Sequence, residues 1–341
     1  MKKFLTVLLA LAMSMSLLLT GCGSSDKSEE SGSSTESETK EPSEVKVAIL
    51  LVGTINDFGW SQAGYEGVAE AAEEYGFEYA YSESVALADM ESTLRDYANQ
   101  GYDLIIAHGD EFSDAVATVA PEFPDSNFAV SNGAQDLALD NAIGMDIRNE
   151  EQGYIAGYAL GILTESNKVG WIGSMEGTSQ KRVENGFRQG LKASNPDAEP
   201  MVSYVGSYSD TAAAKEQAQA MIEQGADVLF QYAQGAGPGV VQAAAENKVK
   251  IVVTSPQQAE MAEGYAAFAI QTVNKDLIKM LIEAYMNGEF GADLQVQGTF
   301  ATNLFQINSI DNNVISEDDM AKIQEQVDGL INGTVELETA R

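Results

Sequence analysis

The side chains with the clearest chemical potential lie in a glycine-bracketed stretch, GTINDFGWSQAGYEG, at residues 53–67. Trp60 stands here just after an apolar run that is typical of a strand. A loop tryptophan either fills a local hydrophobic gap or offers its flat ring to a ligand that stacks on it. Asn56, Asp57 and Gln62 could hydrogen-bond to the same ligand. The first two could also cap the loop backbone, and Gln62 could simply belong to the first turn of a helix.

Catalytic chemistry has little support in this sequence. The chain contains one histidine, His108, and one cysteine, Cys22, which disfavours imidazole catalysis, thiolate chemistry and histidine-rich metal sites. We find no His-Ser-Asp constellation, no recognisable motif of paired carboxylates and no metal-ligand cluster. We therefore expect no enzyme activity, no metal and no cofactor, and we interpret His108 as a structural residue at a strand end.

The chain is strongly acidic, with 52 Asp and Glu residues, 19 Lys and Arg residues and a formal net charge of −33. Such a surface repels nucleic acid and anionic lipid head groups. A nucleic-acid partner is therefore not expected, and the acidity by itself mainly favours solubility.

The first 44 residues are expected to lie outside the fold. Two lysines precede a short apolar stretch that ends in LTGC at 19–22, which resembles the lipobox of bacterial lipoproteins. We predict a signal peptide over 1–21 and a lipid anchor, including palmitate, on Cys22. The apolar stretch is short for a transmembrane span. The remaining segment, 22–44, is rich in Ser and Glu and is predicted to form a disordered tether.

Apolar runs then alternate with segments of helical period. Near-continuous apolar strands separated by helices are typical of a parallel sheet with both faces covered, so we predict an α/β protein with doubly wound lobes. The predicted strands of the first lobe are 45–52, 77–82, 102–108, 127–132 and 142–147, with helices at 61–75, 89–99 and 112–120.

A second lobe of the same kind is predicted to begin with a long amphipathic helix at 150–164. Its strands are expected at 168–174, 201–207, 227–233 and 250–255, with helices at 180–193, 210–224 and after Pro238. Two further strands, 266–272 and 299–307, alternate with helices at 274–287 and 316–333, the last with Ser316 as its N-cap.

The order of these segments predicts a hinge, because the chain would cross between the lobes three times if it returned to each. We assign 45–148 and 256–298 to the N-terminal lobe and 149–255 and 299–341 to the C-terminal lobe. Ligands of open α/β sheets bind at the carboxyl ends of the strands. Asp110 follows such an end, where it could contact a ligand or serve as a helix N-cap.

Several segments, in this order, resemble the basic-membrane-protein family of bacterial substrate-binding lipoproteins: VAILLVGTINDFGWSQAGYEG, EQGYIAGYALGILTESNKVGWIGS, GFRQGLKASNP, YSDTAAAKEQAQAMIEQGADVLFQYAQGAGPGVVQAAAE and INGTVEL. That family includes purine nucleoside receptors of ABC importers and has the type I periplasmic-binding-protein fold. The resemblance implies a monomeric receptor, lipid-anchored on the extracytoplasmic face of the bacterial cell membrane. It would close over a purine nucleoside or a related flat heterocycle and present it to a membrane permease.

The resemblance also implies roles for particular residues. Trp60 and Tyr208 match the two aromatic positions that would hold a base between the lobes, and Asp110 matches a strand end where the family uses polar groups. Gln234 lies in a glycine-rich turn, 231–239, that would face the cleft. This turn lacks the Gly-Lys-Ser/Thr ending of a P-loop. Lys275 matches a lysine that reaches ligand oxygens in the family.

Two departures from the family pattern leave the recognition of ribose open. The chain has Leu51 and Val52 where nucleoside receptors often carry an acidic residue. After the strand at 250–255, where an Asp would suit the ribose hydroxyls, only Ser255 and Gln257 could accept, and weakly. The flat ring is better supported than the sugar.

Two alternatives keep the same fold. A sugar-binding protein would hold a pyranose between the aromatic rings and would need several Asp and Arg side chains, for which Arg148 and Arg182 are the cationic candidates. A ligand sensor for a membrane partner would use the same hinge.

Overall fold

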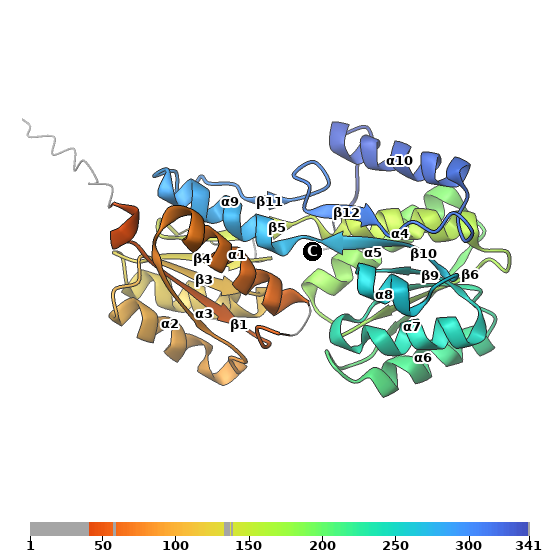
Figure 1. Ribbon diagram of the computed structural model, residues 1–341, viewed down its shortest axis with the longest axis horizontal. Helices are drawn as coiled ribbons and strands as arrows, with labels where there is room; N and C mark the ends of the chain where they lie inside the picture. Colours follow the sequence, from red (N-terminus) through yellow and green to blue (C-terminus); the bar gives the residue numbers. More distant parts are fainter. Residues whose placement is uncertain (1–40, 57–58, 133–136, 138, 340–341) are drawn as a thin grey trace, which may run out of the picture. The chain divides into compact units, whose positions relative to one another are not determined.

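Two sheets with helices on both faces make up the described part of the chain (Figure 1). The structure is a computed structural model that describes residues 41–56, 59–132, 137 and 139–339. The first sheet contains β1 (Lys46–Leu51), β2 (Glu78–Ser82), β3 (Leu104–His108), β4 (Asn127–Ser131), β5 (Ala142–Ile147) and β11 (Gln297–Gly298). These six strands lie in the order β11-β5-β4-β3-β1-β2, and their pairings are parallel.

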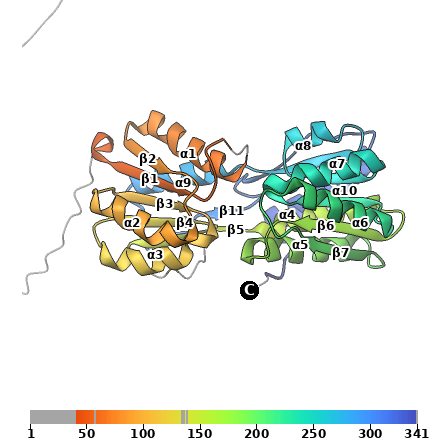
Figure 2. The same cartoon turned by 90° about the horizontal axis from the view of Figure 1, so that it is seen from below.

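Helices cover the two faces of the first sheet in pairs (Figure 2). One pair is α1 (Trp60–Tyr75) and α9 (Asn274–Met286), and the other is α2 (Met90–Asn99) and α3 (Ser113–Val119). Successive side chains of a strand point to opposite faces. Accordingly, Val47, Ile49 and Leu51 of β1 join the cluster that includes α1 and α9, whereas Ala48 and Leu50 join the cluster with α2 and α3. A strand buried on both faces explains the unbroken apolar run.

The second sheet repeats this plan. Its strands are β6 (Lys168–Gly173), β7 (Glu199–Tyr204), β8 (Val228–Tyr232), β9 (Lys250–Val253), β10 (Ala266–Thr272) and β12 (Phe305–Asn308), in the order β12-β10-β9-β8-β6-β7. The edge strand β12 is antiparallel to β10. The helices are α4 (Asn149–Leu163), α5 (Thr178–Ser194), α6 (Thr211–Glu223), α7 (Gly237–Asn247), α8 (Pro256–Met261) and α10 (Glu317–Asn332).

The predicted class, α/β with two doubly wound sheets joined by three connections, is confirmed. The chain passes from β5 to α4, from β10 to α9 and from β11 to β12, each time between the sheets. The predicted N-cap is also confirmed, because the Ser316 hydroxyl accepts from the Asp319 backbone N–H at 3.1 Å.

The tail departs from the expected lobe boundaries. We assigned 256–298 to the first lobe, but β10 pairs with β9 of the second sheet and α8 packs beside them, whereas α9 packs on α1. The second connection therefore falls near residue 273. An apolar run predicts a strand but does not say which sheet edge it joins.

The strand expected at 299–307 is shorter than predicted. Residues 299–304 form turns, and only Phe305–Asn308 pairs as β12. Thr299 and Thr302 exchange backbone-to-hydroxyl hydrogen bonds of 2.9 and 3.1 Å. These local bonds compete with strand pairing.

Helix α4 is buried almost all round, which corrects the expected amphipathic pattern. Its first turn is polar, yet Glu150, Glu151 and Gln152 are buried. The helix lies along α5, and glycines on both helices bring the two backbones together. A Cβ at Gly157 would collide with the Phe187 carbonyl oxygen, and one at Gly190 with that of Tyr154. The glycines therefore set the spacing between the two helices.

Replacing Gly157 with alanine should separate α4 from α5 and lower the free energy of unfolding by about 1–3 kcal/mol, the usual range for overpacking. The loss should appear although alanine favours an isolated helix by about 1 kcal/mol. Chemical denaturation measures the effect. Gly291→Ala is the matched control, because a Cβ there meets nothing within 4 Å; equal losses in both variants would refute the close-packing explanation.

Candidate functional site

Trp60 is the first residue of α1 and lies against the end of β3. Its indole ring stacks on the imidazole of His108, with a centroid distance of 4.3 Å and an interplanar angle of 14°. The indole Nε1–H donates to the His108 carbonyl oxygen at 3.1 Å. Trp60 remains partly exposed, so one ring face is packed while part of the residue meets solvent. His108 is fully buried and hydrogen-bonded, as expected for a structural strand-end residue.

Two carboxyl groups follow β3 directly. Asp110 and Glu111 open the short 3-10 helix η3 (Asp110–Phe112). Burial raises the pKa of Asp110 to about 6, and the charge of Glu111 and a hydrogen bond to it add to the shift. The N-cap of α3 is Phe112, so Asp110 does not take the capping role that the sequence left open. Asp110 therefore holds a proton more readily than an isolated aspartate does.

Side chains from the second sheet meet this pair. The Tyr208 hydroxyl, in the loop after β7, donates to Glu111 Oε1 at 3.3 Å. Burial and the neighbouring charges of Glu111 and Asp110 raise the pKa of Tyr208 to about 12. Tyr232 ends β8, and burial together with the Asp110 charge raises the pKa of its phenol above the ordinary value. A backbone hydrogen bond from Ser179, at the start of α5, partly offsets the rise in the pKa of Asp110. Acidic and aromatic groups thus converge from the strand ends of both sheets.

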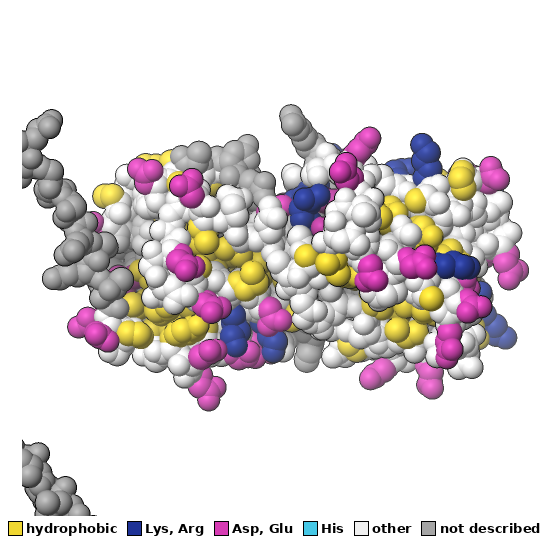
Figure 3. Space-filling model, turned by 90° about the horizontal axis from the view of Figure 1, so that it is seen from above, with side chains coloured by type: hydrophobic (Ala, Val, Ile, Leu, Met, Phe, Trp, Pro, Cys, Tyr) yellow, Lys and Arg dark blue, Asp and Glu magenta, His cyan; other side chains and the backbone are white. Residues whose placement is uncertain are grey.

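Sequence reasoning missed Glu111, Tyr232 and Ser179. Tyr232 carried a usable signal, because it stands at the end of an apolar run and directly before the glycine-rich turn. Glu111 carried a weaker one, since a second acid beside Asp110 is unremarkable in a chain this acidic. Figure 3 shows that acidic side chains are scattered over one whole face of the molecule.

The other predicted ligand residues make mainly local contacts. Gln62 donates to Glu66 at 2.8 Å, one helical turn away, and the Ser255 hydroxyl accepts from the Gln258 backbone as the N-cap of α8. Lys275 forms an ion pair with Glu70 of α1 at 3.0 Å, and this hydrogen bond raises its pKa. Asn56 and Gln234 are exposed. Asp57 and Cys22 lie outside the described residues.

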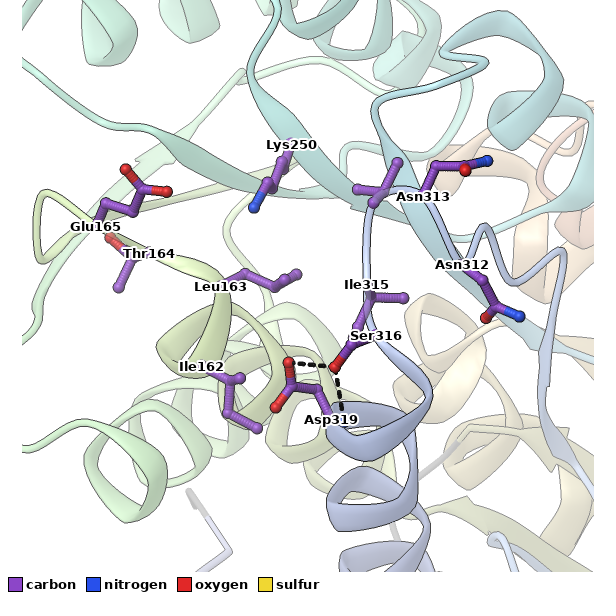
Figure 4. Close-up of a pocket in the computed structure, with 11 residues that line it drawn as sticks. Ile162, Leu163, Thr164, Glu165, Lys250, Asn312, Asn313, Ile315, Ser316 and Asp319 are labelled. Atoms are coloured by element: carbon purple, nitrogen blue, oxygen red, sulfur yellow. Dashed lines mark hydrogen bonds between the residues drawn. The ribbon is translucent and has the colours of Figure 1, made fainter.

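Neither described cavity coincides with these residues. A cavity of about 380 Å³ lies between the end of α4, Lys250 and the start of α10, where Ser316 and Asp319 are hydrogen-bonded to each other (Figure 4). Lys250 begins β9, so this cavity lies at the edge opposite to the strand ends that carry the aromatic and acidic groups. A second cavity is lined by α6, α7 and Met261. No predicted ligand residue lines either one.

Within the described residues, no group of three or more His, Cys, Asp or Glu side chains is placed to hold a metal ion.

No helix among the described residues is both long and apolar enough to cross a bilayer.

The first turn of α4 bonds to two of the connections between the sheets and to the end of β10, which leads into the remaining one. Glu150 accepts from Arg182 at 2.8 Å and from Arg148 of the first connection at 2.7 Å. Arg182 also donates to Asp146, at the end of β5, at 2.7 Å. Burial opposes the ionisation of Glu150, but the hydrogen bonds and charge of Arg182 outweigh it and lower the pKa of Glu150. Both arginines that a sugar site would need are therefore committed here.

Glu151 and Gln152, the next two residues of α4, form hydrogen bonds at or beside the other two connections. Glu151 accepts from the Phe300 backbone N–H at 2.9 Å, in the turn between β11 and β12. Gln152 donates to the Ile270 carbonyl at 2.7 Å, near the end of β10. Burial raises the pKa of Glu151 to about 7, and the negative charges of Glu150 and Asp146 contribute to the rise.

Two doubly wound sheets joined by three connections are the architecture of the type I periplasmic-binding-protein fold. The family model described as "ABC transporter substrate-binding protein PnrA-like" matches residues 44–340. The chain therefore belongs to the Bmp family of ABC-transporter substrate-binding proteins. These proteins bind substrates rather than transform them.

Two proteins of similar sequence and one of similar structure were found beside this family match. The CD4+ T-cell-stimulating antigen of Listeria monocytogenes is 30% identical over 62% of this chain and 60% of its own length. The ABC transporter nucleoside-binding protein BmpA of Lactococcus lactis is 32% identical over 59% of this chain and 58% of its own. The match thus spans about three fifths of these relatives. A solute-binding protein of Aeropyrum pernix, 20% identical, superposes with a TM-score of 0.77 over 87% of this chain and 94% of its own and supports the fold.

Glu151 makes the stability of the protein depend on pH. Its pKa rises from 4.5 in the unfolded chain to about 7 in the folded one, so the folded state binds the extra proton. Stability should therefore fall as the pH rises from about 4.5 to 7 and level off above, by about 1–3 kcal/mol in total. Glu151→Gln keeps an acceptor for Phe300 but cannot ionise. It should unfold at a higher temperature than the parent at pH 8 and at a similar temperature at pH 4.5; a parallel pH dependence in both proteins would exclude Glu151 as the cause.

Proposed function

We propose that this protein captures a purine nucleoside or a related flat heterocycle for an ABC importer. The observation that carries the proposal is Trp60, whose indole is fixed on His108 at a strand end with its N–H already engaged. Trp60 is partly exposed and its N–H is already engaged, so the part of the ring that meets solvent can offer an apolar stacking surface but no N–H donor, which favours a flat ligand. The printed name of the Lactococcus lactis relative supports the same ligand class.

Closure of the two lobes would place the ligand between Trp60 and Tyr208. A ligand that contacts both rings binds the closed form more tightly than the open one and so shifts the population toward closure. In this structure the exposed Tyr208 already contacts the Asp110–Glu111 pair through its hydroxyl. The three connections would serve as the hinge.

The Asp110–Glu111 pair would accept hydrogen bonds from ring or exocyclic N–H groups of the heterocycle. Purines and related rings carry such donors. A pyranose instead offers hydroxyl groups, which are usually bound by arginine and acidic side chains together. Arg148 and Arg182 are bound to Glu150, which makes a sugar ligand less suited to this site. Asn56, Asp57, Gln62, Gln234, Ser255 and Lys275 remain candidate contacts from the sequence.

The lipid anchor on Cys22, the extracytoplasmic location and the permease partner complete the proposal. They are supported by the lipobox-like LTGC at 19–22 and by membership in a family of ABC-transporter substrate-binding proteins. The acidic, lysine-poor surface gives no basis for attraction to anionic head groups, so covalent lipid would supply the attachment.

Mass spectrometry of material released from the denatured protein, followed by calorimetry with nucleosides, nucleobases, riboflavin and pentoses, tests the ligand class. Trp60→Ala should weaken binding of a stacked base by about 1–3 kcal/mol, because that is the usual cost of losing such a stack. Tyr65→Ala is the matched control: it removes a ring from the same helix that packs on Tyr79 and Tyr81 instead. Binding of pentoses without any heterocycle would overturn the proposal.

The acid pair makes a separate prediction about pH. Protonation of Asp110, whose pKa is about 6, removes an acceptor, so affinity for an N–H-bearing heterocycle should fall as the pH drops below about 6. Calorimetry from pH 5 to 8 measures this. In Glu111→Gln the loss of the neighbouring charge should move the fall to lower pH, and an unmoved profile would exclude the pair as its origin.

A further inference from the structure

Trp60 and His108 hold each other through a reciprocal pair of hydrogen bonds as well as through their stacked rings. The indole Nε1–H donates to the His108 carbonyl at 3.1 Å, and His108 Nε2 lies 2.9 Å from the Trp60 carbonyl oxygen. A carbonyl oxygen can only accept, so Nε2 carries the proton. The start of α1 is thereby tied to the end of β3 by both backbone and side chain.

The imidazole ring has little freedom of its own. His108 Nδ1 lies 2.6 Å from the Ser131 hydroxyl, which donates to it because Nε2 holds the ring proton. A Cβ at Gly64, one turn along α1, would lie 2.6 Å from the ring. The ring is fully buried, with Trp60 stacked on its face. Ser131, Gly64 and Trp60 thus fix the orientation of His108.

We propose that His108 is a positioning residue: it fixes the plane of the Trp60 indole and presents the outer ring face to the ligand. A ring that is already immobile loses little side-chain entropy when a ligand stacks on it. This proposal deepens the proposed function and rests on it for the ligand, but the immobility of Trp60 is a property of the free protein. His108 is not expected to touch the ligand.

The ligand-free test uses tryptophan fluorescence in a Trp171→Phe background, which leaves Trp60 as the remaining tryptophan of the chain. His108→Phe keeps a flat ring but loses the donor to the Trp60 carbonyl. His108→Gln keeps a donor but loses the stack. In both we expect faster anisotropy decay and an acrylamide quenching constant raised about twofold, since Trp60 gains rotamer freedom on the nanosecond timescale. Ser131→Ala, which leaves Trp60 untouched, should show a smaller change. Unchanged anisotropy and quenching in both His108 variants would overturn the proposal.

The ligand-bound test is a double-mutant cycle with inosine as the probe. With Trp60 present, His108→Gln should weaken binding about tenfold; in Trp60→Ala it should change affinity no further, because the two residues act as one unit. A merely structural His108 would lower affinity equally in both backgrounds, which would refute positioning. If the parent protein fails to bind inosine, the nucleoside proposal fails, and the fluorescence result still decides whether His108 positions Trp60.

Discussion

The burial of three consecutive polar residues at the start of α4 constrains the rest of the structure. Buried carboxylates and amides are tolerated only when they are paired. Glu150 and Glu151 bond to residues in two of the connections between the sheets, and Gln152 bonds to Ile270 near the end of β10, just before the third. Removing one partner from such a network is costly because it strands the other. The three connections are therefore held at one place in the fold, and a hinge motion would need to preserve these bonds or exchange them together.

This arrangement separates rigid from adjustable parts. Helices α4 and α5 meet backbone to backbone through glycines, so the distance between them is fixed. The Trp60 indole is stacked on His108 at the end of β3, so its orientation is fixed as well. The contact between Tyr208 and Glu111 is different, because it is exposed and joins the loop after β7 to the short 3-10 helix η3. Recognition of a ligand would thus depend mainly on how closely the carboxyl ends of the strands of the two sheets approach each other. It would depend little on packing inside either lobe.

Much of the fold could be predicted from the sequence because strands buried on both faces leave long apolar runs, as in VKVAILLV. The sheet to which β10 belongs could not, since an apolar run carries no information about its neighbour. The buried first turn of α4 was also hidden, because Glu150 and Glu151 read as surface residues until their partners at Arg182 and Phe300 are known. Trp60 stands out in the sequence as a tryptophan in a glycine-bracketed stretch, whereas its contact with His108 gave no local signal, because the two residues are 48 positions apart.

The bond between Tyr208 and Glu111 is long, at 3.3 Å, and solvent-exposed, and this weakness has a consequence for transport. A contact that joins the lobes without a ligand raises the fraction of empty protein in the shut form. In the proposed function, a permease that binds only the closed receptor would then also bind empty receptors, and its ATPase would hydrolyse ATP without transporting ligand. A bond of about 1 kcal/mol or less biases that equilibrium only severalfold. In the proposed import function, weakness at this position would therefore limit ATP hydrolysis by permeases that have docked an empty receptor.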